Sequence, residues 1–230
     1  MNLFDDFIDL LYPRVCTACG NNLFSKEKII CTSCIYKLPK TNLHTEKVNP
    51  LSDFFLGRIN IESAAAYYSF KKGSKVQHLL HQFKYKGGKE IGVYIGELYG
   101  RELIKSESYR KAEVIIPVPL HKKKEKKRGF NQSEYFAKGL SISMKNEVNT
   151  KTLFREKMSE TQTKKSRFKR WENVNNIFLL KNPKNIEGKH ILLVDDVITT
   201  GSTIEACAEV LLQIPDIKIS VAAIACTINQ

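Results

Sequence analysis

The sequence lacks any hydrophobic run that could cross a membrane, because no stretch approaches the roughly 18 consecutive apolar residues of a spanning helix. Residues 1–13, MNLFDDFIDLLYP, also lack the basic region and the cleavage site of a secretory signal peptide. We therefore expect a cytoplasmic protein without membrane insertion. Acidic residues are few relative to basic ones, since 24 Asp and Glu face 37 Lys and Arg and leave a net charge of +13. This excess favours a polyanionic substrate or partner.

The cysteines are unevenly distributed, and four of the six form two Cys-x2-Cys pairs at Cys16, Cys19, Cys31 and Cys34. Two such pairs can supply the four thiolates of a closed, structural zinc site. Disulfides fit poorly with a reducing compartment, and a thioredoxin-type redox centre needs only one such pair beside a βαβ unit. We therefore predict a small zinc-binding module with an N-terminal helix and a linker over residues 1–50. The metal would supply folding free energy that so short a segment cannot gain from its core.

Residues 191–203, ILLVDDVITTGST, carry the most informative chemistry of the chain. The apolar run Ile191–Val194 is typical of a strand buried on both faces of a parallel sheet. Asp195 and Asp196 follow where that strand is expected to end, and a hydroxyl-rich turn then leads into a helix expected over residues 204–212. A helix N-terminus attracts anions, and carboxylates accept hydrogen bonds from sugar hydroxyls. The stretch therefore predicts a site for a sugar phosphate.

Two other interpretations of this stretch compete. LLVDD is also typical of the first strand of a response-regulator receiver domain, but too little sequence follows Thr203 for the hundred or so residues that such a domain needs. A buried strand that ends in a solvated acidic turn is the simpler alternative.

Apolar periodicity predicts further elements of an α/β domain. Strands are expected over residues 61–70 and 114–119, and helices over residues 74–84, 91–104 and 133–142. In the second of these helices, glycines recur at four-residue intervals, at Gly92, Gly96 and Gly100, which permits close packing of a neighbour. Residues 40–53 are predicted to be a linker, and two basic segments, 120–130 and 155–170, are predicted to be loops.

The stretch ILLVDDVITTGST resembles the signature with which type I phosphoribosyltransferases bind phosphoribosyl pyrophosphate (PRPP). The resemblance implies an α/β fold over residues 51–230, with a parallel sheet flanked by helices. It implies that Asp195 and Asp196 hold the ribose hydroxyls and are the residues closest to catalysis, with Mg²⁺ bound together with PRPP. It also implies a PRPP-binding loop made of Val197, Thr199, Thr200, Gly201, Ser202 and Thr203.

A wider set of motifs, PVPLHKKKEKKRGFNQ and TQTKKSRFKRWENVNNIF together with the acidic pair and the cysteine pairs, resembles the ComF/GntX family of competence and DNA-utilisation proteins. Members of that family help to bring transforming single-stranded DNA across the inner membrane, alongside a helicase. The chain has no cysteine at position 2 and no glutaminase domain, so glutamine-dependent amidotransferase activity is not expected. The residues expected to contact pyrophosphate or nucleic acid are Lys84, Lys122, Lys123, Lys124, Arg128, Gln132, Gln162 and Arg170.

The resemblance implies a PRPP-binding protein that handles single-stranded DNA during DNA uptake. Two alternatives stay open: a Mg²⁺-dependent phosphoribosyltransferase acting on another acceptor without a DNA role, and an adaptor whose zinc module docks on a helicase. Phe130, Phe168 and Trp171 are available to stack on DNA bases. The lysine-rich segment fits either pyrophosphate or DNA, so charge alone does not separate these functions.

Overall fold

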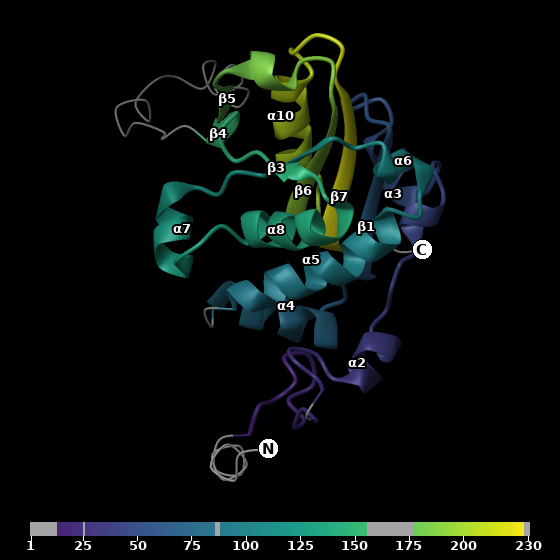
Figure 1. Ribbon diagram of the computed structural model, residues 1–230, viewed down its shortest axis with the longest axis vertical. Coiled ribbons are helices and arrows are strands. Elements are labelled where there is room, and N and C mark those ends of the chain that lie inside the picture. Colours follow the sequence, from purple (N-terminus) through teal and green to yellow (C-terminus); the bar gives the residue numbers. More distant parts are fainter. Residues whose placement is uncertain (1–12, 25, 86–87, 156–176, 228–230) are drawn as a thin grey trace.

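The computed structural model describes residues 13–24, 26–85, 88–155 and 177–227, and it contains a five-stranded sheet in the order β1-β7-β6-β2-β3 (Figure 1). All neighbouring strands in this sheet run parallel. The strands are β1 (Ser63–Ser69), β2 (Val114–Pro117), β3 (Glu147–Val148), β6 (His190–Ile198) and β7 (Lys218–Cys226). A separate antiparallel ribbon consists of β4 (Leu153–Arg155) and β5 (Phe178–Leu180). The predicted parallel α/β fold is confirmed.

Helices connect the strands and cover the sheet. The longer ones are α4 (Lys75–Tyr85), α5 (Lys89–Leu103), α8 (Gln132–Met144) and α10 (Ser202–Leu211). The shorter ones are α2 (Thr32–Lys37), α3 (Pro50–Phe55), α6 (Glu107–Arg110), α7 (Lys122–Arg128) and the 3₁₀ turns η1 (Leu43–Thr45) and η3 (Pro183–Ile186). No helix among the described residues is long and apolar enough to cross a membrane.

The chain order makes the β2–β6 pair a switch point of the sheet. From β2 the chain passes through α8 to β3, and from β6 it passes through α10 to β7, so the two connections leave this strand pair in opposite directions. Right-handed crossovers then place α8 and α10 on opposite faces of the sheet. The loops that follow β2 and β6 therefore diverge, and open α/β sheets bind ligands at such a switch point.

Glycines hold α5 and α8 in close contact, as their spacing predicts. A β-carbon added to Gly96 would lie 2.8 Å from the Cα of Gly139, well inside van der Waals contact. A β-carbon on Gly139 would overlap the backbone oxygen of Val93. The backbones of α5 and α8 thus touch with no side chain between them, and α8 is fixed between α5 and the sheet.

The interpretation of residues 40–53 as a linker is wrong. This segment forms η1 and the start of α3, and Leu51 is fully buried. Asn49 is buried as well: its side chain accepts hydrogen bonds from the backbone of Leu51 and Ser52, both at 3.0 Å, and donates to the oxygen of Leu43. Polar residues that suggested solvation in fact satisfy the backbone of a packed corner.

The first basic segment is also more ordered than predicted, because residues 122–128 form α7 rather than a loop. His121 begins this helix by accepting a hydrogen bond from the backbone nitrogen of Lys123 at 3.1 Å, and Gly129, with a φ of 81°, ends it. Lysine, glutamate and arginine are good helix formers once both ends are capped. The N-terminal helix predicted before Pro13 and residues 156–170 of the second basic loop lie outside the described residues.

Candidate functional site

The acidic pair lies inside the last part of β6, not beyond its end. The strand continues through Ile198, and Asp195 is opposite Ala223 of β7. On its other side β6 pairs with β2, where Pro117 is opposite Val194. The sequence correctly predicted the apolar run as the buried part of the strand, but β7 extends the ladder further. The two carboxylates are therefore fixed by the sheet at the β2–β6 switch point.

Neighbouring helices engage both carboxylates. The Oγ atom of Ser133, in the first turn of α8, donates a hydrogen bond of 2.8 Å to Oδ1 of Asp195. The same carboxylate oxygen accepts the backbone N–H of Asp196 at 2.8 Å. The ammonium of Lys84, near the end of α4, lies 2.8 Å from Oδ2 of Asp196. Lys84 was predicted to contact pyrophosphate or nucleic acid, and here it is held at the acidic pair.

These surroundings change the acidity of Asp195. Burial of its carboxyl and the nearby charge of Asp196 raise the pKa of Asp195 from 3.8 to about 7, although Ser133 and Lys84 act in the opposite direction. Two adjacent carboxylates repel each other, so the second one ionises less readily. A bound cation or a donor from a ligand would favour ionisation of both.

The hydroxyl-rich turn joins β6 to α10 beside this pair. Gly201 adopts a φ of 69°, in the left-handed region, and precedes the first residue of α10. The hydroxyls of Thr200 and Ser202 lie 3.1 Å apart, and both side chains are exposed. The first turn of a helix has backbone N–H groups without intrahelical acceptors. The turn thus offers hydroxyl and amide donors to an anion, and Val197 and Thr203 lie on either side of it in the sequence.

The RGFNQ motif forms the corner between α7 and α8. Asn131 caps α8 by accepting from the backbone of Ser133 at 3.2 Å, and its amide donates to the oxygen of Val118 just after β2. Arg128 donates to Oε1 of Gln132 at 2.7 Å. Gln132 is only 1% exposed, and its amide nitrogen is bonded to the Phe130 oxygen at 3.3 Å. Its direct contact with a ligand stays a prediction, but in this structure it orients Arg128.

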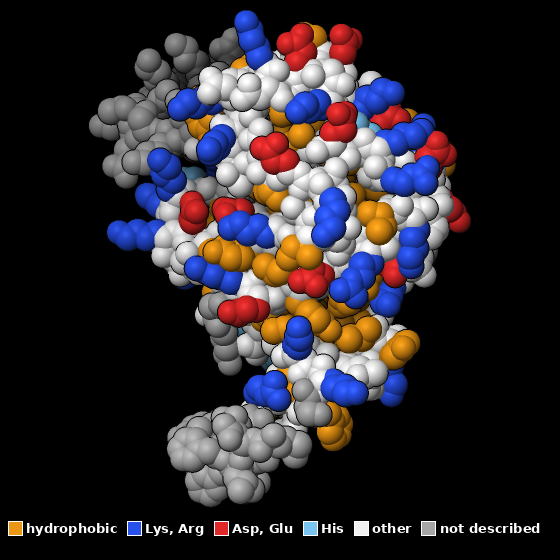
Figure 2. Space-filling view, in the orientation of Figure 1, with side chains coloured by type: hydrophobic (Ala, Val, Ile, Leu, Met, Phe, Trp, Pro, Cys, Tyr) orange, Lys and Arg blue, Asp and Glu red, His pale blue; other side chains and the backbone are white. Residues whose placement is uncertain are grey.

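A chain of contacts joins several of the predicted residues. Arg128 donates a hydrogen bond to Gln132, and Ser133, which follows Gln132, donates one to Asp195. Lys84 forms an ion pair with Asp196. The exposed lysines of α7 (Lys122, Lys123 and Lys124) extend from this corner into solvent. Figure 2 shows Lys and Arg side chains spread over this face of the molecule, with Asp and Glu between them. Gln162, Arg170, Phe168 and Trp171 lie outside the described residues.

Sequence analysis missed two residues of this region. Ser133 stands directly after the RGFNQ motif, at the start of the helix predicted over residues 133–142, and a hydroxyl at a helix start was a usable signal. Arg58 donates to the oxygen of Thr200 at 3.3 Å. Nothing in the sequence around Arg58 indicates that contact, because 142 residues separate the two.

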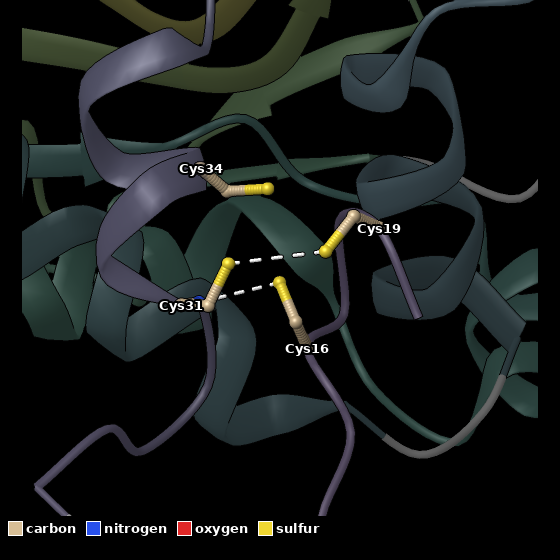
Figure 3. A group of neighbouring side chains, drawn as sticks. All are labelled: Cys16, Cys19, Cys31 and Cys34. Atoms are coloured by element: carbon tan, nitrogen blue, oxygen red, sulfur yellow. Dashed lines mark hydrogen bonds between the residues drawn. The ribbon is translucent and has the colours of Figure 1, made fainter. Parts of the chain in front are cut away.

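The four predicted cysteine ligands converge at the N-terminal end of the described chain (Figure 3). Cys16 and Cys19 come from a loop, while Cys31 caps α2 and Cys34 lies within it. All four sulfurs lie within 4.8 Å of one another, and those of Cys19 and Cys31 are 3.8 Å apart. Tetrahedral Zn–S bonds of about 2.3 Å require sulfurs roughly 3.8 Å apart. The cluster can therefore hold a zinc ion.

The protonation of these thiols also fits a metal site. Burial raises the pKa of Cys16, but backbone N–H groups of Cys31, Cys19 and Ala18 outweigh it and lower that pKa to about 7. Burial and the neighbouring sulfurs raise the pKa of Cys34 well above its ordinary value. Four thiolates so close together can ionise only if a cation offsets their mutual repulsion.

Parts of the chain match known proteins. Residues 119–230 match the family described as phosphoribosyl transferase domain. The chain is 33% identical over 138 residues to the DNA utilization protein YhgH of Escherichia coli O157:H7, covering 59% of this chain and 60% of that protein. It is 33% identical over 139 residues to the Competence protein ComFC of Bacillus subtilis (strain 168), covering 60% of this chain and 54% of that protein.

Among solved structures, an adenine phosphoribosyltransferase aligns over 64% of this chain and 75% of its own, with a TM-score of 0.39 and 14% identity. The matched region spans only 60% and 54% of the two curated relatives. Over about 60% of its length the chain is thus similar to proteins named for competence and DNA utilization, and its residues 119–230 match the phosphoribosyl transferase domain family.

Proposed function

We propose that this protein binds PRPP together with Mg²⁺ at the switch point between β2 and β6, and that it handles single-stranded DNA during DNA uptake. One observation carries the PRPP part: β6 holds the acidic pair and leads directly into the Gly201 turn at the start of α10. A carboxylate pair and a phosphate-binding helix start are thereby joined by a few residues of one strand. A phosphorylated ribose has a partner for each of these groups, because its hydroxyls can donate to carboxylates and its phosphate can accept from the helix start.

Each part of PRPP has a matching group. The 5′ phosphate would be held by Thr199, Thr200, Gly201, Ser202 and Thr203, which supply hydroxyl and backbone donors. Asp195 and Asp196 would accept bonds from the ribose hydroxyls, and the pyrophosphate would face Lys84 and Arg128. Mg²⁺, a hard cation that prefers oxygen ligands, would neutralise the phosphate charge when bound with PRPP.

The proposed role in handling DNA is supported by the charge of the chain and by the names of similar proteins. The chain carries a net charge of +13, and the lysines of α7, among them Lys122, Lys123 and Lys124, are exposed. One pyrophosphate does not require that many cations. The names of the relatives refer to competence and DNA utilization. The lysines of α7 would follow the phosphates of a single strand, with binding that weakens as salt rises.

The cysteine cluster would hold one structural zinc ion, with residues 1–50 as its module and residues 51–230 as the phosphoribosyltransferase-like domain. A second candidate function, the docking of a protein partner such as a helicase on this module, is favoured by two exposed aromatic side chains, Phe24 (78%) and Tyr36 (81%). Phe24→Ser with Tyr36→Ser should abolish helicase binding while zinc content and PRPP affinity stay unchanged.

The test of the main proposal is one set of mixtures. The protein is incubated with PRPP, Mg²⁺ and a fluorescent single-stranded oligonucleotide, and both pyrophosphate release and oligonucleotide anisotropy are measured. Ribose 5-phosphate and duplex DNA serve as controls. A DNA affinity that changes with PRPP, without pyrophosphate release, supports a ligand-gated DNA protein. Release that requires an added small acceptor supports an enzyme instead, and no binding of PRPP by calorimetry contradicts the proposal.

A further inference from the structure

The segment just before β1 lies against the turn between β6 and α10. The guanidinium of Arg58 donates through Nη2 to the backbone oxygen of Thr200 at 3.3 Å and to Oε2 of Glu205 at 2.5 Å. Its central carbon lies 4.8 Å from the centre of the Phe54 ring. About a third of the Arg58 side chain is exposed, so these contacts are partly shielded from solvent. One side chain thus joins α3, the turn and the first turn of α10.

Aromatic side chains close the same side of the turn. A β-carbon at Gly201 would lie 2.7 Å from Cε1 of Phe54 and 2.8 Å from Cε1 of Phe55. Together with the φ of 69°, this leaves room only for glycine. The outer side of the turn is therefore packed against α3 and Arg58, and only its other side can receive a ligand.

The hydrogen bond to Thr200 also sets the direction of the next N–H group. In a planar trans peptide, the carbonyl of one residue and the N–H of the following residue point in opposite directions. Because the Thr200 oxygen faces Arg58, the N–H of Gly201 points away from Arg58, towards the open side of the turn. That N–H is the first backbone donor that an anion at the start of α10 would meet.

Arg58 has an electrostatic effect as well. Glu205 lies in the first turn of α10, where its negative charge opposes the binding of an anion. The Arg58 guanidinium pairs with this carboxylate and offsets its charge. Without that pair, a phosphate at the turn would meet an uncompensated carboxylate nearby.

We propose that Arg58 is a positioning residue for a phosphate monoester bound at the start of α10: it orients the Thr200–Gly201 peptide and neutralises Glu205. This inference rests on the proposed PRPP site, in which that monoester is the 5′ phosphate. It predicts a selective effect, because Arg58 should matter for ligands that carry the 5′ phosphate and not for pyrophosphate alone.

The test is calorimetry with PRPP, ribose 5-phosphate and pyrophosphate, each with Mg²⁺. Arg58→Ala should weaken the binding of PRPP and of ribose 5-phosphate by about tenfold, because one charge-assisted hydrogen bond and the positive charge of Arg58 are lost. The affinity for pyrophosphate should stay unchanged. Arg58→Ala with Glu205→Gln should recover the electrostatic part of that loss, since the unpaired carboxylate is gone, while the part due to peptide orientation should remain. Arg58→Lys should be intermediate, and Arg101→Ala on the exposed face of α5 is the control.

The outcomes separate this inference from the proposal beneath it. If the unmodified protein does not bind PRPP, the proposed function fails. The positioning role is overturned if the unmodified protein binds PRPP and Arg58→Ala binds it equally well. It is also overturned if Arg58→Ala weakens the affinity for pyrophosphate as much as the affinity for PRPP. Failure of Glu205→Gln to restore affinity in the double variant would overturn the electrostatic part.

Discussion

The ammonium of Lys84 lies 2.8 Å from the carboxylate of Asp196, so the acidic pair expected to meet the ribose already has a cation of its own. Both charges also act on the neighbouring carboxyl: Asp196 raises the pKa of Asp195, and Lys84 lowers it. The three side chains from α4 and β6 are therefore linked electrostatically. Ligand binding at this point must compete with, or make use of, the Lys84 contact.

Lys84→Ala should weaken Mg²⁺–PRPP binding near neutral pH. Removal of the cation raises the pKa of Asp195 further, so a larger fraction of that carboxyl is protonated and cannot accept from a ribose hydroxyl. A further rise of about one unit in this pKa would lower the ionised fraction, and with it the affinity for PRPP, about fivefold at pH 7. Calorimetry at about pH 7 and about pH 9 checks this, since the deficit should shrink at the higher pH. Lys84→Arg, which keeps the charge, is the control, and a pH-independent deficit would contradict the linkage.

The pKa of Asp195 also predicts how stability depends on pH. Between its ordinary value of 3.8 and its folded value of about 7, the folded chain keeps a proton that the unfolded chain has released. The folded state binds more protons in that window, so the contribution of Asp195 to the free energy of unfolding falls as pH rises through it. Asp195→Asn removes this fall and keeps an acceptor for Ser133.

Urea denaturation at about pH 5 and about pH 8 measures how far the free energy of unfolding of Asp195→Asn differs from that of the unmodified protein. The variant should gain stability relative to the unmodified protein at the higher pH. An equal difference at both pH values would show that Asp195 is not the titrating group. Ionisable groups far from the acidic pair contribute equally in both proteins, so the comparison cancels them.

Close packing of α5 on α8 predicts a large cost for a single methyl group. Gly139→Ala would place a β-carbon against the backbone of Val93 and 2.8 Å from the Cα of Gly96, and neither can yield without moving a helix. Overpacking of this kind typically costs about 1–3 kcal/mol. Thermal and urea unfolding should show this loss, while the exposed-site control Arg101→Ala should stay within about 0.5 kcal/mol. A neutral Gly139→Ala would mean that the two helices are not in backbone contact.

The sequence predicted what depends on local pattern. The apolar run 191–194, the glycine spacing of α5 and the Cys-x2-Cys pairs each follow a periodicity or a fixed spacing, and the structure contains the corresponding strand, helix contact and cysteine cluster. Their physical causes act over a few residues, so they are visible in a short window.

What the sequence did not predict depends on contacts between distant segments. Arg58 meets the Thr200 turn across 142 residues, and Ser133 meets Asp195 across 62. The helix α7 was missed for a different reason: a run of lysines is equally typical of a solvated loop until its caps, His121 and Gly129, are recognised. The extension of β6 beyond Val194 depends on its pairing with β7, which no local pattern contains.

Cys31→Ser should remove the metal from the cysteine cluster. A serine hydroxyl is a much poorer zinc ligand than a thiolate, and the remaining three sulfurs leave the coordination open. Elemental analysis should show the loss of about one zinc per chain, accompanied by increased proteolysis of the surrounding segment, since metal binding supplies folding free energy there. Cys207→Ala is the matched control, because Cys207 is fully buried elsewhere and should keep the zinc. Full zinc retention in Cys31→Ser would contradict the assignment.

The lysines of α7 should contribute to DNA binding through counterion release. Lys122→Gln, Lys123→Gln and Lys124→Gln together keep the helix, because glutamine is nearly as good a helix former as lysine. If all three contact phosphates of a single strand, the slope of log affinity against log salt should fall by about 2, at roughly 0.7 per phosphate. A triple variant at Lys37, Lys105 and Lys111, of the same net charge, controls for a general change in the field. A slope that changes equally in both variants would show that α7 has no special role, whereas a change confined to α7 would place the DNA strand beside Arg128 and the PRPP site, where occupancy of one could affect the other.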